Sequence, residues 1–252
     1  MIDTRIKELE IEGKVLLLAK ISKVEKYLDD FKAGNIYMNT LEYFKNLEKK
    51  SKVKGQGDKY EASVIYNEAE IIITDPETGE NVHILDAEEI TFHLDNRIKS
   101  PIFCLYSIDT QNLKVINETD GYIEIAPYLP EEKLTRLIND FGENLVFIFP
   151  NQLLEKMREA AKSKSLRLAW GKVKYFDYNK SIDKRFDPSS TEICFNKSDE
   201  FEYQNEYRIL IDNKVTDNPY VLNIGDISDI SKRISTRDFF SGTVKIRFEK
   251  VK

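Results

Sequence analysis

Phe201–Ile211 has the sequence FEYQNEYRILI and carries the most informative pattern in this chain of 252 residues. If residues 203–211 form a strand, their side chains alternate between the two faces of a sheet. Gln204, Glu206 and Arg208 then line one face, which is either a solvated surface on which Glu206 pairs with Arg208 or the wall of a pocket. The opposite face is mostly apolar and suits a core: Tyr203, Asn205, Tyr207, Ile209 and Ile211.

The composition is that of a soluble globular protein, with 41% hydrophobic and 33% charged residues. A chain of this length can bury most of its apolar surface without disulfides. The net charge of −6, from 44 acidic and 38 basic residues, argues against a surface that coats nucleic acid or membranes.

The cysteine and histidine content indicates a reduced compartment and no zinc site. Cys104 and Cys194 each lie in an apolar run, which favours two buried thiols. With His83 and His93 they show no zinc-ligand spacing, so we expect no metal. No apolar signal core or membrane span of about 18 residues is present. We therefore expect a cytoplasmic protein that does not engage a membrane, in the cell that makes it or in a cell that it infects.

The first 47 residues predict the order strand, helix, strand, helix. Residues 14–21 form an apolar run typical of a buried strand. Ser22 and Glu25 fit a capping box, and Gly34 is placed to end the helix. A strand follows over residues 35–39, and Thr40 is placed to cap the next helix. Val24, Tyr27, Leu28 and Phe31 recur at helical spacing and predict the buried stripe of the first helix.

The rest of the chain is predicted to be rich in strands. Residues 61–94 are expected to be β-structure, in which 71–74 and 82–85 flank a turn at 75–80 and form a hairpin, and 90–94 is another strand. Residues 101–106 form a short central strand. Helices are expected after Pro130 and over 151–163, on either side of a buried strand at 144–149. The later strand candidates are 166–178, 191–196, 203–211, 219–223 and 243–249. The prediction is one α+β domain over residues 1–252, with a mixed or antiparallel β core and flanking helices.

Gln204 and Glu206 carry the strongest chemical signal. A carboxylate can accept a hydrogen bond from a ribose hydroxyl and stabilise positive charge that develops at the sugar carbon. An amide two residues earlier can orient the acceptor.

Three weaker signals have structural alternatives. Asp58 and Glu61 could serve a metal-dependent nuclease, but a solvated loop turn is the simpler interpretation. His93 could be a general base, or a structural or exposed histidine. The basic region 45–54 could attract phosphate, or simply be a solvated helix end and loop, at Lys45, Lys49, Lys50, Lys52 and Lys54.

Three segments resemble motifs of an uncharacterised family of bacterial and phage proteins. That family has an apolar strand with Cys and Ser, a Val-x-Tyr strand and a closing Tyr-Glu-x-Glu-aromatic-Arg. The similar segments here are 102–107 (IFCLYS), 173–175 (VKY) and 203–208 (YQNEYR), with Gln204 in place of the first Glu. Phe201 stands near the position of that family's Trp. The resemblance implies a related fold.

Gln204-Asn205-Glu206, followed by an aliphatic run, is also similar to the last active-site motif of mono-ADP-ribosyltransferases. Those enzymes open with a strand, helix and strand that clamp NAD, which residues 14–39 resemble. They place an Arg or His on the first strand, where this chain has Lys20, and Ser-Thr-Ser on the second, where it has Asn39-Thr40. The resemblance implies NAD as cofactor, with Lys20, Tyr37, Thr40 and Arg208 as its contacts.

The resemblances lead to two hypotheses about function. The first is an NAD-using ADP-ribosyltransferase or NAD glycohydrolase in phage–bacterium conflict, in which Glu206 stabilises the ribosyl cation and Gln204 orients a protein or nucleic-acid acceptor. The second is a non-catalytic protein on the same scaffold that binds a phage or host partner, as an inhibitor or sensor of a defence system.

Overall fold

The main sheet is organised around strand β5 (Pro101–Ile108) in the computed structural model, which describes residues 3–7, 9–51, 58, 60, 62–93, 95–178 and 190–250. One edge of β5 pairs with β12 (Glu206–Ile211), from Tyr106 opposite Glu206 to Ile102 opposite Leu210. The predicted central strand is confirmed, because β5 contacts three other strands.

The opposite edge of β5 is shared by two strands. β1 (Leu17–Ser22) pairs with its last three residues, and β2 (Asn35–Thr40) pairs with its first two. No residue of β1 or β2 pairs with residues 103–105 in between. The two strands therefore diverge, and α2 (Glu25–Lys32) joins them across the gap. This gap between β1 and β2 is called the wedge below.

Further antiparallel pairs extend the sheet to eight strands. On the β1 side, β8 (Asn144–Ile148) is followed by β14 (Ser231–Ser235). On the β2 side lies β13 (Tyr220–Asn223), and β9 (Leu168–Lys172) lies beyond β12.

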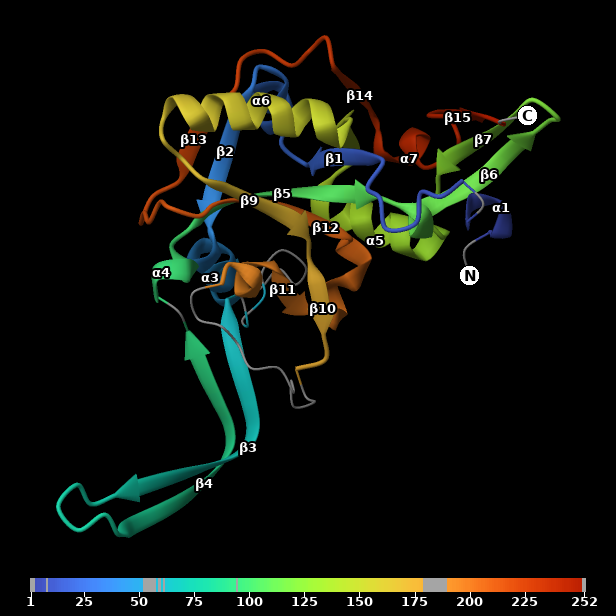
Figure 1. The fold of residues 1–252 in the computed structure, drawn as a ribbon. Coiled ribbons are helices and arrows are strands. Elements are labelled where there is room, and N and C mark those ends of the chain that lie inside the picture. Colours follow the sequence, from blue (N-terminus) through green and yellow to red (C-terminus); the bar gives the residue numbers. More distant parts are fainter. Residues whose placement is uncertain are drawn as a thin grey trace.

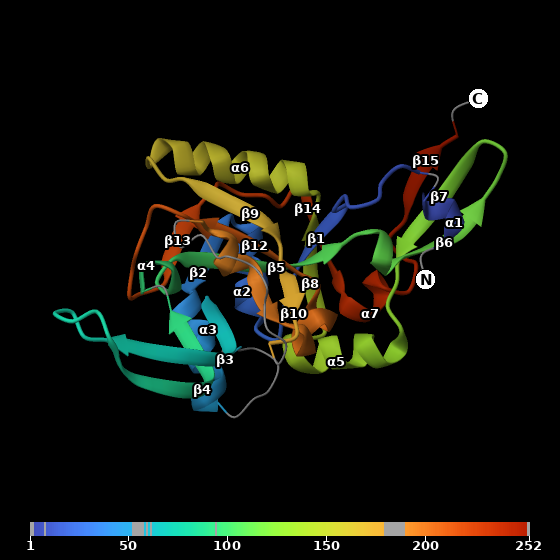
Figure 2. The same ribbon diagram turned by 60° about the horizontal axis from the view of Figure 1, so that its bottom comes forward.

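Helices cover both faces of this sheet, as Figures 1 and 2 show. α6 (Pro150–Ser163) packs on one face, where alternate residues of β5 and β12 enter a core with Leu153, Leu154 and Met157. α5 (Glu131–Phe141) and α7 (Thr236–Phe239) belong to a second core on the other side. The chain is a single α+β domain, as predicted.

Smaller elements surround this body. A three-stranded sheet is formed by β6 (Leu113–Glu118), β7 (Tyr122–Pro127) and β15 (Ile246–Glu249), and β10 (Lys174–Phe176) pairs with β11 (Asn196–Ser198). β3 (Ser63–Thr74) and β4 (Asn81–His93) form a hairpin around the predicted turn, and it projects as a long arm in Figure 1. The separate strand predicted at 90–94 was wrong, because residues 90–93 are the end of β4. The remaining helices are α1 (Thr4–Lys7), α3 (Leu41–Ser51), α4 (Asp95–Ile98), η1 (Thr110–Asn112), η2 (Glu192–Phe195) and η3 (Asp199–Gln204).

Two strand predictions in the last third were wrong. Residues 203–211 are not one strand, because η3 ends at Gln204 and β12 begins at Glu206. Asn205 lies between them in the left-handed region, at φ 35° and ψ 53°, which Asn tolerates better than most residues. Most of 191–196 is the 3-10 helix η2 rather than a strand.

The start of α2 also differs from the prediction. No capping box forms, because Ser22 Oγ accepts from the Val24 amide and the side chain of Glu25 meets Asn144 and Arg233 instead. Of the predicted stripe, only Leu28 and Phe31 are buried, whereas Val24 and Tyr27 are exposed. The predicted cap of the next helix is confirmed, because Thr40 Oγ1 accepts from the Tyr43 amide at 3.2 Å.

Gly34 follows the C-terminal end of α2 and lies against the backbone of Gly225. This close approach can be tested by substitution. The φ of Gly34 is +79°, and a Cβ added there would lie 1.8 Å from the Gly225 carbonyl oxygen. Gly13 has a similar φ of +74° but nothing within 4 Å of such a Cβ. Gly13→Ala should therefore cost only the backbone term, about 1–2 kcal/mol. Gly34→Ala should lower the free energy of unfolding by roughly 1–3 kcal/mol more, as measured by urea denaturation. Equal losses in the two variants would contradict the close approach to Gly225.

Candidate functional site

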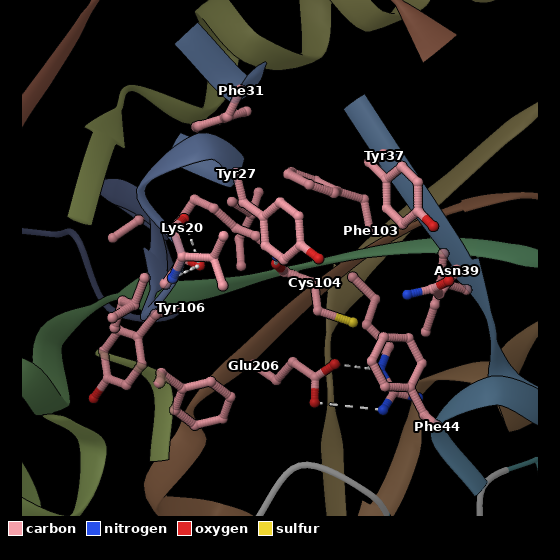
Figure 3. Close-up of a pocket in the computed structure, with 18 of the residues that line it drawn as sticks. Lys20, Tyr27, Phe31, Tyr37, Asn39, Phe44, Phe103, Cys104, Tyr106 and Glu206 are labelled. Atoms are coloured by element: carbon pink, nitrogen blue, oxygen red, sulfur yellow. Dashed lines mark hydrogen bonds and ion pairs between the residues drawn. The ribbon is translucent and has the colours of Figure 1, made fainter. Parts of the chain in front are cut away.

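A cavity of about 620 Å³ fills the wedge between β1 and β2. β5 and β12 form its floor, α2 and α3 contribute its rim, and Lys197 and Gln204 enter from the β11–η3 region. Figure 3 shows Lys20, Tyr37 and Glu206, which are far apart in the sequence, around this one space. A volume of this size lies within the usual range for ligand pockets, about 300–1,000 Å³.

Lys20 occupies the part of the wedge where β5 has no neighbouring strand. Its ammonium donates to the Cys104 carbonyl at 3.1 Å and lies 4.6 Å from the centre of the Phe103 ring. The amine thus satisfies a strand carbonyl that β1 and β2 leave unpaired. Burial lowers the pKa of Lys20, and the neighbouring Cys104 and Glu206 oppose that shift.

Glu206 is the central charge of the cavity and is 6% exposed. Its Oε1 accepts from Arg208 Nε at 2.8 Å, and its Oε2 accepts from Lys197 Nζ at 3.0 Å. Burial alone would raise the pKa of Glu206. The charges of Arg208 and Lys197, with hydrogen bonds from Arg208 and the Cys104 thiol, outweigh burial and hold that pKa well below its usual range. Glu206 is therefore ionised at neutral pH.

The residues around Glu206 fix its position. Arg208, 1% exposed, also donates to the Cys194 carbonyl at 2.7 Å, which anchors the guanidinium from a second element. The Glu206 amide donates to the Tyr175 hydroxyl at 2.9 Å. Burial raises the pKa of the Cys104 thiol, and the nearby Glu206 carboxylate raises it further, so Cys104 is held as a neutral donor.

Gln204 reaches the same cavity although it is not on the strand. Its Oε1 accepts from Lys197 Nζ at 2.7 Å, so Lys197 bridges Gln204 and Glu206. The left-handed turn at Asn205 is what brings Gln204 back beside the strand. Asn205 Nδ2 donates at 2.7 Å to both the Ser107 carbonyl and Asn112 Oδ1, which holds the turn against β5.

Aromatic side chains form the rim of the cavity. The rings of Tyr27 on α2 and Tyr37 on β2 are nearly parallel, at 6° between planes, with their centres 6.5 Å apart. They are 54% and 48% exposed, so part of each ring is accessible to a ligand. Tyr43 and Phe44 of α3 continue the aromatic wall in an edge-to-face pair at 5.3 Å.

The lining carries an excess of positive charge although the whole chain is acidic. Among the described residues, five basic and two acidic side chains line the cavity. Lys26 pairs with Asp30 at 2.8 Å, and Glu206 is held by Arg208 and Lys197. The remaining positive field favours an anionic ligand. The charged lining residues are Lys20, Lys23, Lys26, Asp30, Lys197, Glu206 and Arg208.

Five of the six predicted site residues line this cavity, and Thr40 is the exception. Thr40 is 5% exposed, and its hydroxyl caps the start of α3. It is therefore not part of the cavity wall. The five that converge are Lys20, Tyr37, Gln204, Glu206 and Arg208.

The weaker signals have different outcomes. Asp58 is 1% exposed and accepts from the Tyr60 and Ser198 amides, each at 2.8 Å, so the solvated turn expected there was wrong. Its proposed partner Glu61 lies outside the described residues, as do Lys52 and Lys54. The side chains of Lys49, Lys50 and His93 also lie outside the described part of the chain. Among the described residues, no group of three or more His, Cys, Asp and Glu side chains is placed to hold a metal ion.

The sequence reasoning missed Lys197 and Tyr27. No local pattern marks Lys197, and Tyr27 was assigned to the core. Cys104, Ser107 and Tyr175 were noted only as parts of motifs, yet these motifs meet around the Asn205–Glu206 turn. Ser107 Oγ donates to the Asn205 carbonyl at 2.8 Å, beside the Cys104 and Tyr175 contacts of Glu206.

Comparison with known proteins found no matching family model, no matching curated protein and no matching solved structure. In the described part of the chain, no helix is both long and apolar enough to cross a membrane.

The ionisation of Glu206 predicts a specific pH dependence of stability. Because its pKa is lower in the folded protein than the value of about 4.3 expected when unfolded, its stabilisation is complete above that pH. It is lost as the pH falls from there toward the folded-state pKa. Glu206→Gln should lower the free energy of unfolding at pH 7 by about 3–5 kcal/mol, because it leaves buried cations unbalanced. In urea titrations, the difference from wild type should shrink below about pH 4.

Glu124→Gln is the matched control for this prediction. Glu124 is 8% exposed and is paired with Arg247 at 2.8 Å, but it lies in the small sheet away from the cavity, and the Arg247 side chain is 53% exposed. Its replacement should cost less stability at pH 7. A Glu206→Gln difference that stays constant from pH 7 to about pH 3 would contradict the assigned ionisation.

Proposed function

We propose that this protein binds NAD in the wedge cavity and acts as an ADP-ribosyltransferase-like enzyme, with Glu206 as its central carboxylate. The observation that supports the proposal is that Lys20 of β1, Tyr37 of β2 and Glu206 of β12 line one cavity. The resemblance of the sequence assigned NAD contact to the first two and catalysis to the third.

The size, charge and aromatic rim of the cavity support NAD as its ligand. Its volume of about 620 Å³ suits a nucleotide, and its excess of basic side chains suits the negative charges of a pyrophosphate. The exposed parallel rings of Tyr27 and Tyr37 present flat surfaces on which a nicotinamide or adenine ring can stack. Lys20 supplies a charge on β1, where the transferase family has Arg or His.

The chemistry that we assign to Glu206 is the support of a sugar cation. The bond between nicotinamide and ribose breaks, nicotinamide leaves with the bonding electrons, and positive charge develops at the ribosyl carbon. An ionised carboxylate beside that carbon stabilises the charge and accepts a hydrogen bond from a ribose hydroxyl. The acceptor, or water, then attacks the carbon and loses a proton. In this scheme Gln204 orients the acceptor, which is a protein, a nucleic acid or water.

A second candidate function is binding without transfer, and one observation favours it. Both carboxylate oxygens of Glu206 are engaged by Arg208 and Lys197. Two cations in contact reduce the negative field that the carboxylate offers to a developing cation. A protein with this site could hold NAD or a phage or host partner as an inhibitor or sensor, without catalysis. The setting in phage–bacterium conflict remains a prediction from the sequence resemblance.

Tyr37→Ala tests the binding part of the proposal. Removing one stacking ring should raise the Kd for NAD by about tenfold or more in isothermal titration calorimetry. The control is Tyr66→Ala on the arm, because Tyr66 is 45% exposed and Tyr37 is 48% exposed. If wild-type protein does not bind NAD, or if both variants bind it equally well, the cavity is not an NAD site of this kind.

Glu206→Gln tests the chemical part. The release of nicotinamide from NAD, followed by chromatography, should fall by about 10²–10³-fold, because the developing charge loses its stabilisation. Glu124→Gln should release nicotinamide at the wild-type rate, and circular dichroism shows whether each variant is folded. NAD binding without nicotinamide release in the wild type would contradict the enzyme and support the second candidate.

A further inference from the structure

The arm formed by β3 and β4 stands apart from the rest of the fold. Its strands pair with each other from Ser63 opposite His93 to Thr74 opposite Asn81, and with no other strand among the described residues. Figures 1 and 2 show it extending well away from the body, beyond α3 and α4. A two-stranded ribbon alone is only marginally stable in water, so a ribbon this long is a candidate for a structure completed by a partner.

The outer half of the arm exposes apolar side chains on both faces. Ile71, Ile72 and Ile73 are consecutive, so their side chains alternate between the faces, and they are 40%, 50% and 47% exposed. A strand that packs one face on a core buries every second residue, and this segment does not. Tyr66, nearer the body, is 45% exposed.

The outer edges of the arm are also open. Each strand has one edge paired and one edge without a strand neighbour in the described residues. Proteins usually protect such edges with charged side chains, above all lysine, or with proline or a bulge, and the only charged side chains of these two strands are acidic. Neither strand contains a lysine or a proline, and the one shift in register lies between Ile73 and Thr74, near the tip. Both edges are therefore suited to the addition of a further strand.

The charge of the arm indicates which kind of partner it would bind. Residues 62–93 contain eight acidic residues and no lysine or arginine. A nucleic acid would be repelled, and a second copy of the arm would bring carboxylates against carboxylates. A basic segment is attracted at both short and long range. The exposed acidic residues are Glu70, Glu77, Glu80, Asp86, Glu88 and Glu89.

We propose that the arm is a docking site for a basic protein partner, which adds an extended segment of alternating basic and apolar residues as a third strand. Backbone hydrogen bonds to the open edge supply affinity, and the apolar side chains cover one face of Ile71–Ile73. The basic side chains meet the carboxylates of the arm. This assignment does not depend on NAD binding in the wedge.

The test uses the full chain and a labelled peptide of about ten residues in which lysine and valine alternate, followed by fluorescence anisotropy. We expect saturable binding that weakens between about 50 and 500 mM salt. A peptide that alternates lysine and proline has the same charge, but every second residue lacks a backbone N–H and is held at a φ of about −65°, which disfavours strand pairing. It should bind at least about tenfold more weakly. A peptide that alternates glutamate and valine should not bind.

Two matched variants locate the site. Ile72→Lys should weaken binding of the lysine–valine peptide by about tenfold or more, because it removes an apolar contact and adds a like charge. Val221→Lys adds the same charge at a residue of similar exposure, 47% against 50%, on β13, and should leave binding unchanged. Equal binding by the two variants, equal binding of the lysine–proline peptide, or no binding by wild type would overturn the proposal. So would sedimentation showing a dimer that Ile72→Lys dissociates, since a second copy would then be the occupant.

Discussion

The central constraint on this structure is that one edge of β5 is divided between two strands. β1 pairs with the end of β5 and β2 with its beginning, so residues 103–105 lack a strand neighbour on that edge. An unpaired strand edge inside a protein needs another source of hydrogen bonds. Lys20 supplies one of them by donating to the Cys104 carbonyl. The same divergence of β1 and β2 opens the cavity, so the space for a ligand follows from the way the sheet is joined.

The charges in the wedge follow from that geometry. A carboxylate as buried as Glu206 is stable in its ionised form only when cations and donors surround it. Arg208, two residues further along β12, meets it on the same face, and Lys197 approaches from β11. The arrangement holds the buried carboxylate of Glu206 among basic side chains. A pocket with an excess of basic side chains suits an anionic ligand.

The arm and the wedge are two different solutions for open strand edges. In the wedge, the free edge of β5 lies inside the fold, and the side chain of Lys20 satisfies one of its carbonyls. In the arm, the free edges remain at the surface, with exposed isoleucines and only acidic charges beside them. The first solution creates a cavity for a small ligand, whereas the second leaves a surface for an extended chain.

The sequence by itself determined the elements that are marked by neighbouring residues, such as apolar runs, a helix cap and a turn. The apolar runs predicted β1, β5 and β8. The cap at Thr40 and the hairpin turn were also predicted correctly. The alternation over Tyr207–Ile211 identified the core face of β12. Tertiary structure decided the rest, because it depends on contacts between residues far apart in the chain. The turn at Asn205 exists because Ser107 and Asn112 hold it. Lys197 belongs to the site only because β11 pairs with β10 beside Glu206. Tyr27 repeats at helical spacing like a core residue, but it is exposed because the divergence of β1 and β2 leaves its side of α2 facing the cavity.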